Sequence, residues 1–155
     1  MPDWLSHILI GLIFAEIFNI RKKGLVVLGS LLPDFVVKVH LLGVFFHMSD
    51  KLVFVTQLYH SPVMGLIIPG LVAPFFKYDW KKIYLLVMTG FMLHLFADSL
   101  TKLFHDGILL YPLSHGYFSF GLLWPEQFWI VIIGSLAVYT VIRLAKHKTL
   151  LRKPF

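Results

Sequence analysis

The chain contains no cysteine, which excludes both a disulfide framework and a thiolate metal site. This absence leaves the redox compartment open. Charge is also scarce, because Asp, Glu, Lys and Arg make up 14% of the 155 residues, against about a quarter in an average soluble domain. The eight acidic residues are outnumbered by fourteen Lys and Arg, and the net charge is +6. The basic residues are not interleaved with aromatic ones in the pattern that stacks on bases, so no nucleic-acid partner is expected.

Apolar residues fill most of the chain instead. They account for 58% of the sequence, and the mean hydropathy is +0.81. Apolar runs recur along the whole length, at residues 8–20, 25–33, 35–46, 62–76, 83–97 and 122–142. The first run does not resemble a cleaved signal, because Asp3 precedes it and its basic cluster follows it. We therefore expect one membrane-embedded domain over residues 1–155, an all-α polytopic integral membrane bundle of about five or six helices.

Several of these runs are shorter than the roughly 20 residues that a simple membrane span requires. We expect some helices to be short and packed inside the bundle, or tilted within the bilayer. Pro33 is expected to end the helix before it, because proline has no N–H and its ring clashes with the preceding turn.

The basic residues predict the orientation of the chain. Eleven of the fourteen lie in three clusters, at residues 21–23, 77–82 and 143–153. Short basic loops stay in the cytoplasm. Placing all three clusters there predicts an inner-membrane protein with a basic cytoplasmic tail at about 143–155, which would contact anionic membrane lipids. The stretch 35–60 must then begin and end outside, as an interfacial or re-entrant pair of helices.

Residues that commonly bind metals fall at the opposite end of this predicted path. His7 lies at the start of the first run, and Asp34 follows the second. His60 comes just before the fourth run, and His94 and Asp98 lie at the end of the fifth. The spacing of His94 and Asp98 places both on one helical face, one turn apart. An unpartnered carboxylate at membrane depth costs several kcal/mol by the estimates for buried ions, and a cation supplies the partner.

The sequence therefore predicts one or more divalent ions, bound at the non-cytoplasmic face by these five residues. Mixed nitrogen and oxygen ligands suit Zn, Mn or Fe. A simpler interpretation of the pair is a helix end where His94 and Asp98 hydrogen-bond each other or water.

The order and approximate spacing of these motifs resemble the YdjM-like family of membrane-bound metal-dependent hydrolases. The resemblance depends on His7, GSLLPD at 29–34, HS at 60–61, HLFADSLT at 94–101 and GILLYPLS at 107–114. That family is distantly similar to zinc-dependent phospholipase C. The resemblance implies an α-helical metal site that hydrolyses a phosphoester, with zinc as the first candidate metal and the five residues above as its ligands.

The chain departs from the family pattern in ways that call for further ligands. A second Asp two residues after the first is common in the family, whereas this chain has Val36 after Asp34. An insertion between Thr101 and Gly107 also replaces a shorter family motif. The candidates for the gap are His40, His47, His105, Asp106 and His115, of which His105 and Asp106 lie in that insertion directly after the HxxxD helix.

The function we expect is hydrolysis of a lipid or lipid-linked phosphate by a metal-activated water. Asp34 or Asp106 would act as the general base, and Ser61 would orient His60 from outside the ligand set. Two alternatives remain. A structural ion could hold the helices together, and protein ligands would then fill all of its coordination positions. A metal transporter is less favoured, because among the intramembrane residues only Glu16 would continue a polar path. The sequence does not indicate an oligomeric state.

Overall fold

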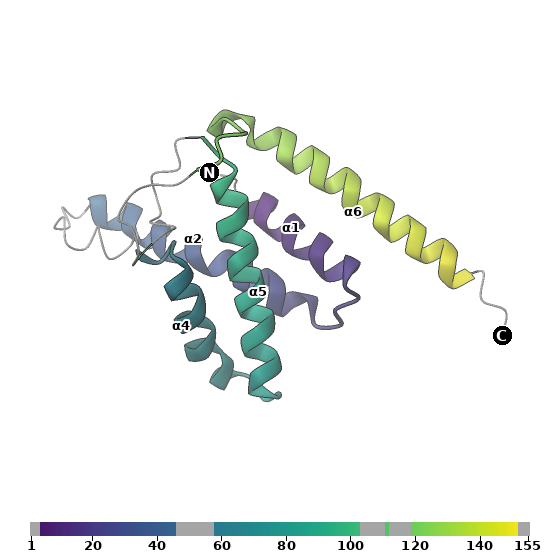
Figure 1. The fold of residues 1–155 in the computed structure, drawn as a ribbon, viewed down its shortest axis with the longest axis horizontal. Coiled ribbons are helices and arrows are strands. Elements are labelled where there is room, and N and C mark those ends of the chain that lie inside the picture. Colours follow the sequence, from purple (N-terminus) through teal and green to yellow (C-terminus); the bar gives the residue numbers. More distant parts are fainter. Residues whose placement is uncertain (1–3, 46–57, 103–110, 112–118, 152–155) are drawn as a thin grey trace.

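The computed structural model of the chain describes residues 4–45, 58–102, 111 and 119–151, with the side chains of 36–45, 125 and 149–151 left aside. Within these ranges the fold is all-helical, as predicted, with five α-helices and two short 3-10 helices (Figure 1). In chain order the elements are α1 (Trp4–Ile17), α2 (Lys23–Phe45), α4 (Pro62–Val72), η1 (Ala73–Phe75), α5 (Trp80–Ser99), η2 (Pro125–Gln127) and α6 (Phe128–Leu151).

The central helix is α5, which contacts α1, α2, α4 and η1. Its largest interface is with α2, and glycine makes this interface close. A Cβ atom added at Gly29 of α2 would lie 2.1 Å from the Val87 carbonyl oxygen, and one at Gly90 of α5 would lie 2.0 Å from the Val26 carbonyl oxygen. The two backbones therefore touch directly, because glycine has no side chain to hold the helices apart.

The helix end expected at Pro33 is wrong. α2 continues from Lys23 through Pro33 to Phe45, so the beginning of the expected 35–60 pair is continuous with the preceding helix. Proline has no N–H, so the helix lacks the one hydrogen bond that this residue would donate to the Gly29 carbonyl. The Pro33 ring is fully buried, and its packing offsets part of that loss. The remainder of the expected pair, at 46–57, lies outside the described residues.

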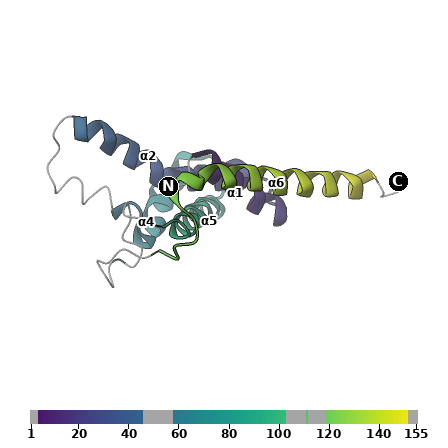
Figure 2. The ribbon, with the colours of Figure 1, turned by 90° about the horizontal axis from the view of Figure 1, so that it is seen from above.

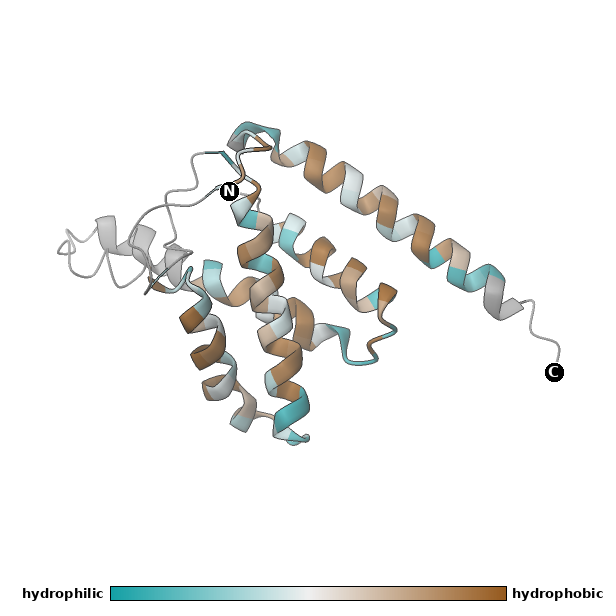
Figure 3. Ribbon diagram, viewed as in Figure 1, coloured by the Kyte–Doolittle hydropathy of each residue, from teal (hydrophilic) through white to brown (hydrophobic). Residues whose placement is uncertain are grey.

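α6 stands at the side of the bundle and packs on α1 (Figures 1 and 2). The segment Phe128–Lys148 contains an 18-residue window with a mean hydropathy of 2.0, and none of that window is buried. Within the described ranges it is the one helix that is long and apolar enough to cross a membrane, whereas α1 and Pro62–Phe75 are apolar but shorter. Apolar residues follow α6 along most of its length (Figure 3). The helix includes Arg143 and Lys146, so the expected tail from about 143 begins as helix.

Basic residues of the first and third clusters meet at one end of the fold, and the segment of the second cluster contacts the first. The Lys22 ammonium lies 3.0 Å from the centroid of the Tyr78 ring, which joins the turn before α2 to the turn before α5. Glu16 lies near the end of α1 at this end of the molecule, nine residues after His7. Its carboxylate forms ion pairs with three cations, Lys23, Arg143 and Lys146.

Candidate metal site

Five buried side chains from four helical segments meet at the opposite end of α1. His7 lies in the first turn of α1, Asp34 follows Pro33 in α2, and His60 lies in the turn two residues before α4. The last two turns of α5 supply the other two, His94 and Asp98. Asp34 is 2% exposed and the other four are 0% exposed. The structure thus brings together the five residues that the sequence places at one end of the helices.

Asp98 lies at the centre of this group. Its Oδ2 is 3.1 Å from His94 Nε2 and 3.7 Å from His60 Nε2, and its Oδ1 is 3.4 Å from His7 Nε2. Asp34 Oδ1 lies 3.7 Å from His60 Nε2 and 3.9 Å from His94 Nε2. Two ligands of a tetrahedral zinc ion, each about 2.0–2.1 Å from the metal, are roughly 3.3 Å apart. The separations between donor atoms are therefore close to those of a metal cage.

The charges of the group also fit a cation. Two carboxylates are buried, and in the described part of the chain their ion pairs are with histidine alone. Both oxygens of Asp98 and Oδ1 of Asp34 accept no hydrogen bond there. With neutral imidazoles the cluster carries a charge of −2 in a dry interior, which is costly unless it is compensated. One divalent cation would neutralise it.

The orientation of His94 is fixed by a hydrogen bond to the backbone of α2. Its Nδ1 lies 2.7 Å from the carbonyl oxygen of Ser30, and a carbonyl can only accept. Nδ1 therefore carries the hydrogen, and in the neutral ring Nε2 keeps a lone pair directed toward Asp34 and Asp98. The Ser30 hydroxyl lies 2.8 Å from the carbonyl oxygen of Val27 in its own helix and 3.2 Å from that of His7, so its single hydrogen is directed between α2 and α1. Such outer hydrogen bonds orient metal-binding histidines in known sites.

The donor atoms form two overlapping groups that share His94. One group is His7, His94 and Asp98, the other is Asp34, His60 and His94, and within each group all donors lie within 4.8 Å of one another. The His7 and His94 rings are stacked, with centroids 3.8 Å apart. Nε2 of His94 has one lone pair and serves one ion at a time. Asp98 directs one oxygen to each group, so the geometry accommodates either one ion or two ions bridged by Asp98.

The model of a protein family described as YdjM inner membrane protein matches residues 1–152 of the chain. The chain belongs to the YdjM inner membrane protein family. This membership confirms the resemblance found in the sequence and, together with α6, the predicted membrane localisation. No curated protein and no solved structure matches the chain.

The GSLLPD segment is one of the motifs that resemble YdjM proteins. Several of its residues have a structural role. Gly29 lets α5 approach, Ser30 orients His94, and Asp34 faces the cluster. Sequence reasoning missed Ser30 as a site residue. Its contact with His94 is made by the backbone carbonyl, so no side-chain pattern in the sequence marks it.

For the remaining predicted residues of this YdjM protein, the described part of the structure leaves the predicted roles untested. Ser61 caps α4, accepting from the Met64 amide at 3.4 Å, and its orienting role on His60 stays a prediction. His40 lies in the stretch of α2 whose side chains are left aside. The others lie outside the described residues: His47, His105, Asp106 and His115.

Proposed function

We propose that this YdjM family protein is a polytopic membrane protein that binds a divalent cation and uses it to hydrolyse a phosphoester of the lipid type. The ligands would be the five clustered residues, His7, Asp34, His60, His94 and Asp98. Zinc is the first candidate, and Mn or Fe would suit the same donors. The observation that carries the proposal is the pair of buried carboxylates, which faces three imidazoles and no Lys or Arg in the described part of the chain.

A divalent cation in this site would supply an activated water and polarise a phosphoryl oxygen. The residues of the chain would do the rest. His94 is held by Ser30 and Asp98 contacts three imidazoles, so both would act as fixed ligands. Asp34 is held less closely, at 3.7 Å and 3.9 Å from its histidine neighbours, and we assign to its carboxylate the removal of the proton from the attacking water. Asp106 remains the second candidate for this base.

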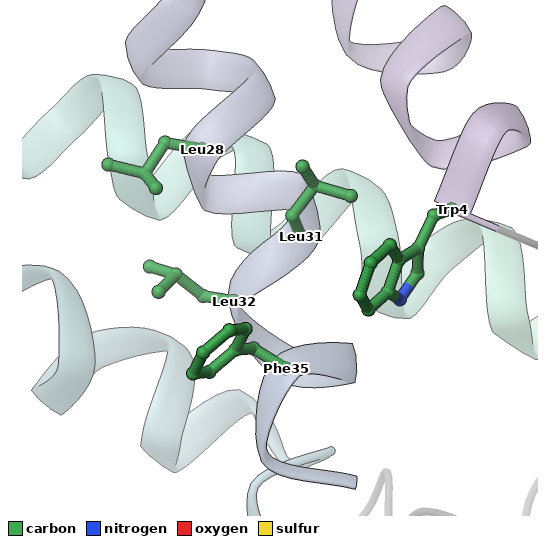
Figure 4. A pocket seen from close by; sticks show the side chains of 5 residues that line it. All are labelled: Trp4, Leu28, Leu31, Leu32 and Phe35. Carbon is green, nitrogen blue, oxygen red and sulfur yellow. The ribbon is translucent and has the colours of Figure 1, made fainter. Parts of the chain in front are cut away.

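An apolar cavity favours a substrate with a hydrocarbon chain. The cavity has a volume of about 220 Å³, and Figure 4 shows the side chains from α1 and α2 that line it. Trp4 is one turn before His7, and Phe35 directly follows Asp34, so the cavity borders the segments that supply two site residues. A lipid chain in this cavity would reach the protein sideways from the bilayer. The lining residues are Trp4, Leu28, Leu31, Leu32 and Phe35.

The test of this function is a release assay with purified protein in detergent, using glycerophospholipids and polyprenyl phosphates as substrates. We expect release of a phosphorylated product that stops on chelation with EDTA and returns with zinc. Asp34→Asn is expected to lower the rate at least about 100-fold, because a general base contributes roughly 10²–10⁴-fold. Asp79→Asn is the matched control, because Asp79 is half exposed and caps the far end of α5, where Asn caps equally well. Release that survives chelation would exclude the mechanism.

A structural ion is the second candidate function, and the burial of the cluster favours it. The five side chains are at most 3% exposed, and they join four helical segments. Structural sites are closed, whereas catalytic sites keep a position for water or substrate. X-ray absorption on the zinc-loaded protein separates the two. An exchangeable oxygen ligand supports hydrolysis, and four protein ligands without water support the structural role.

For the membrane orientation we propose that the basic end is cytoplasmic and the His/Asp end is not. Support comes from the gathering of the first and third basic clusters at one end, where Lys22 covers Tyr78 in the segment of the second and Glu16 binds the cations of α2 and α6. Short segments rich in Lys and Arg remain on the cytoplasmic side of inner-membrane proteins.

The lack of native cysteine makes this orientation directly testable. In right-side-out vesicles, Trp124→Cys is expected to react with a membrane-impermeant maleimide. Lys148→Cys is expected to react only after the vesicles are permeabilised, because it lies at the basic end. Trp124 is 47% exposed and Lys148 is also exposed, so both positions should be reactive when the reagent reaches them. The reverse labelling pattern would invert the proposed orientation.

A further inference from the structure

A second charged cluster lies at the basic end of the fold, remote from the His/Asp site along α1. Glu16 is its one carboxylate in the described structure, and the side chain is 4% exposed. Three cations face it, so two positive charges have no acidic partner there. The cations come from α2 and from the last turns of α6: Lys23, Arg143 and Lys146.

Lys146 and Arg143 differ in how many of their hydrogen-bond donors have a partner. Lys146 donates to the backbone oxygen of Glu16 and to the side chain of Asn19, and it also pairs with Glu16 Oε2 at 3.6 Å. Arg143 makes a single hydrogen bond in the described structure, from Nη1 to Glu16 Oε1 at 3.2 Å. A guanidinium has five N–H donors in a planar fork, and the Arg143 side chain is 58% exposed. Most of its donors are therefore available to an anion.

A cavity of about 390 Å³ opens beside this cluster. Its lining combines the Arg143 guanidinium with the imidazole of His147, one turn further along the same face of α6. Leu144 adds an apolar side chain to the lining. The described lining residues are Arg143, Leu144, Lys146 and His147.

We propose that this cavity binds the phosphate of an anionic lipid headgroup, with Arg143 as the principal donor. The planar fork of arginine suits two phosphate oxygens at once. The location favours a lipid over a soluble phosphate, because α6 is the apolar, unburied helix and its basic last turns would lie at the membrane surface. Leu144 would contact the apolar part of the same lipid. This proposal depends on the membrane location of α6 and is independent of hydrolysis at the His/Asp site.

Native mass spectrometry of the full chain in mixed micelles tests the proposal, with phosphatidylglycerol and phosphatidylcholine in equal amounts. We expect the wild-type protein to retain one phosphatidylglycerol selectively. Arg143→Gln is expected to weaken this retention about tenfold or more, the effect of losing a charge-assisted hydrogen bond. Lys81→Gln is the matched control, because it removes the same charge from an exposed residue at the basic end.

A second variant guards against loss of folding, since Arg143 also pairs with Glu16. His147→Ala removes a lining side chain from the cavity without touching that ion pair, and we expect it to weaken retention severalfold. Equal retention by wild type, Arg143→Gln and His147→Ala would overturn the proposal. An equal loss in Lys81→Gln would also overturn it, because the attraction would then be diffuse. Displacement of the lipid by inorganic phosphate or glycerol phosphate at millimolar concentration would reassign the site to a soluble ligand.

Discussion

Replacing His94 with alanine is expected to remove the bound metal from the purified protein. His94 belongs to both donor groups, so its loss leaves neither group with three ligands. The two carboxylates would remain buried with fewer partners, at 0% and 2% exposure. Even partners outside the ligand set cost 10–100-fold in metal affinity when they are lost, so we expect at least about a 100-fold loss for this ligand. The measurement is the metal content per chain after purification in detergent, by plasma mass spectrometry.

His147→Ala is the control for this substitution, because it removes an exposed imidazole from α6 at the other end of the molecule. It should keep the wild-type stoichiometry. Asp98→Ala should lose the metal as His94→Ala does, since Asp98 contacts all three imidazoles. Far-UV circular dichroism of each variant separates loss of metal from loss of helix. Wild-type metal content in both His94→Ala and Asp98→Ala would count decisively against the site.

The sequence indicated which residues would lie together because the polar residues are rare and most of them fall near helix ends, although Asp34 lies within α2. Once the basic clusters were placed on one side, His7, His60 and Asp98 had to lie near the other side. Polar side chains that are buried in an apolar protein need polar partners, so these residues are expected to contact one another. The structure gives this arrangement, and the described residues add the backbone of α2 as its support.

The sequence could not predict how α2 passes through Pro33. The missing N–H of a proline argues for a helix end. Whether the helix continues depends on tertiary packing, and here the Pro33 ring is buried inside a helix that continues. Ser30 was missed for a related reason. It acts through its backbone carbonyl, which every residue possesses, so its side chain gives no indication that His94 is bound there.

The two ends of α1 show how a short helix can serve two charged centres. His7 and Glu16 are nine residues apart, which separates them by about half a revolution and roughly 13 Å along the axis. Their surroundings differ in charge: His7 faces a carboxylate, and Glu16 faces cations. α1 therefore connects the candidate metal site to the helix that carries the proposed lipid site, since α6 packs on α1.

Gly90→Ala is expected to destabilise the protein and to lower its metal affinity together. The added Cβ would lie 2.0 Å from the Val26 carbonyl oxygen and 2.8 Å from the Ser30 amide nitrogen. Both are backbone atoms of α2, so no side-chain rotation relieves the clash, and the helices must move apart. Overpacking of this kind typically costs about 1–3 kcal/mol, and occasionally more. The same movement would break the bond between Ser30 and His94, which is 2.7 Å long.

Gly134→Ala is the matched control, because nothing lies within 4 Å of a Cβ atom added at that position of α6. It should leave metal binding unchanged and could stabilise the helix by up to about 1 kcal/mol, the difference between Gly and Ala in a helix. Thermal unfolding in detergent, followed by circular dichroism, and metal content per chain measure the two effects on each variant. If Gly90→Ala unfolds earlier yet binds metal as tightly as the wild type, the orientation of His94 by Ser30 is not required for binding. If it matches Gly134→Ala in both measurements, the close contact of α2 with α5 is itself wrong.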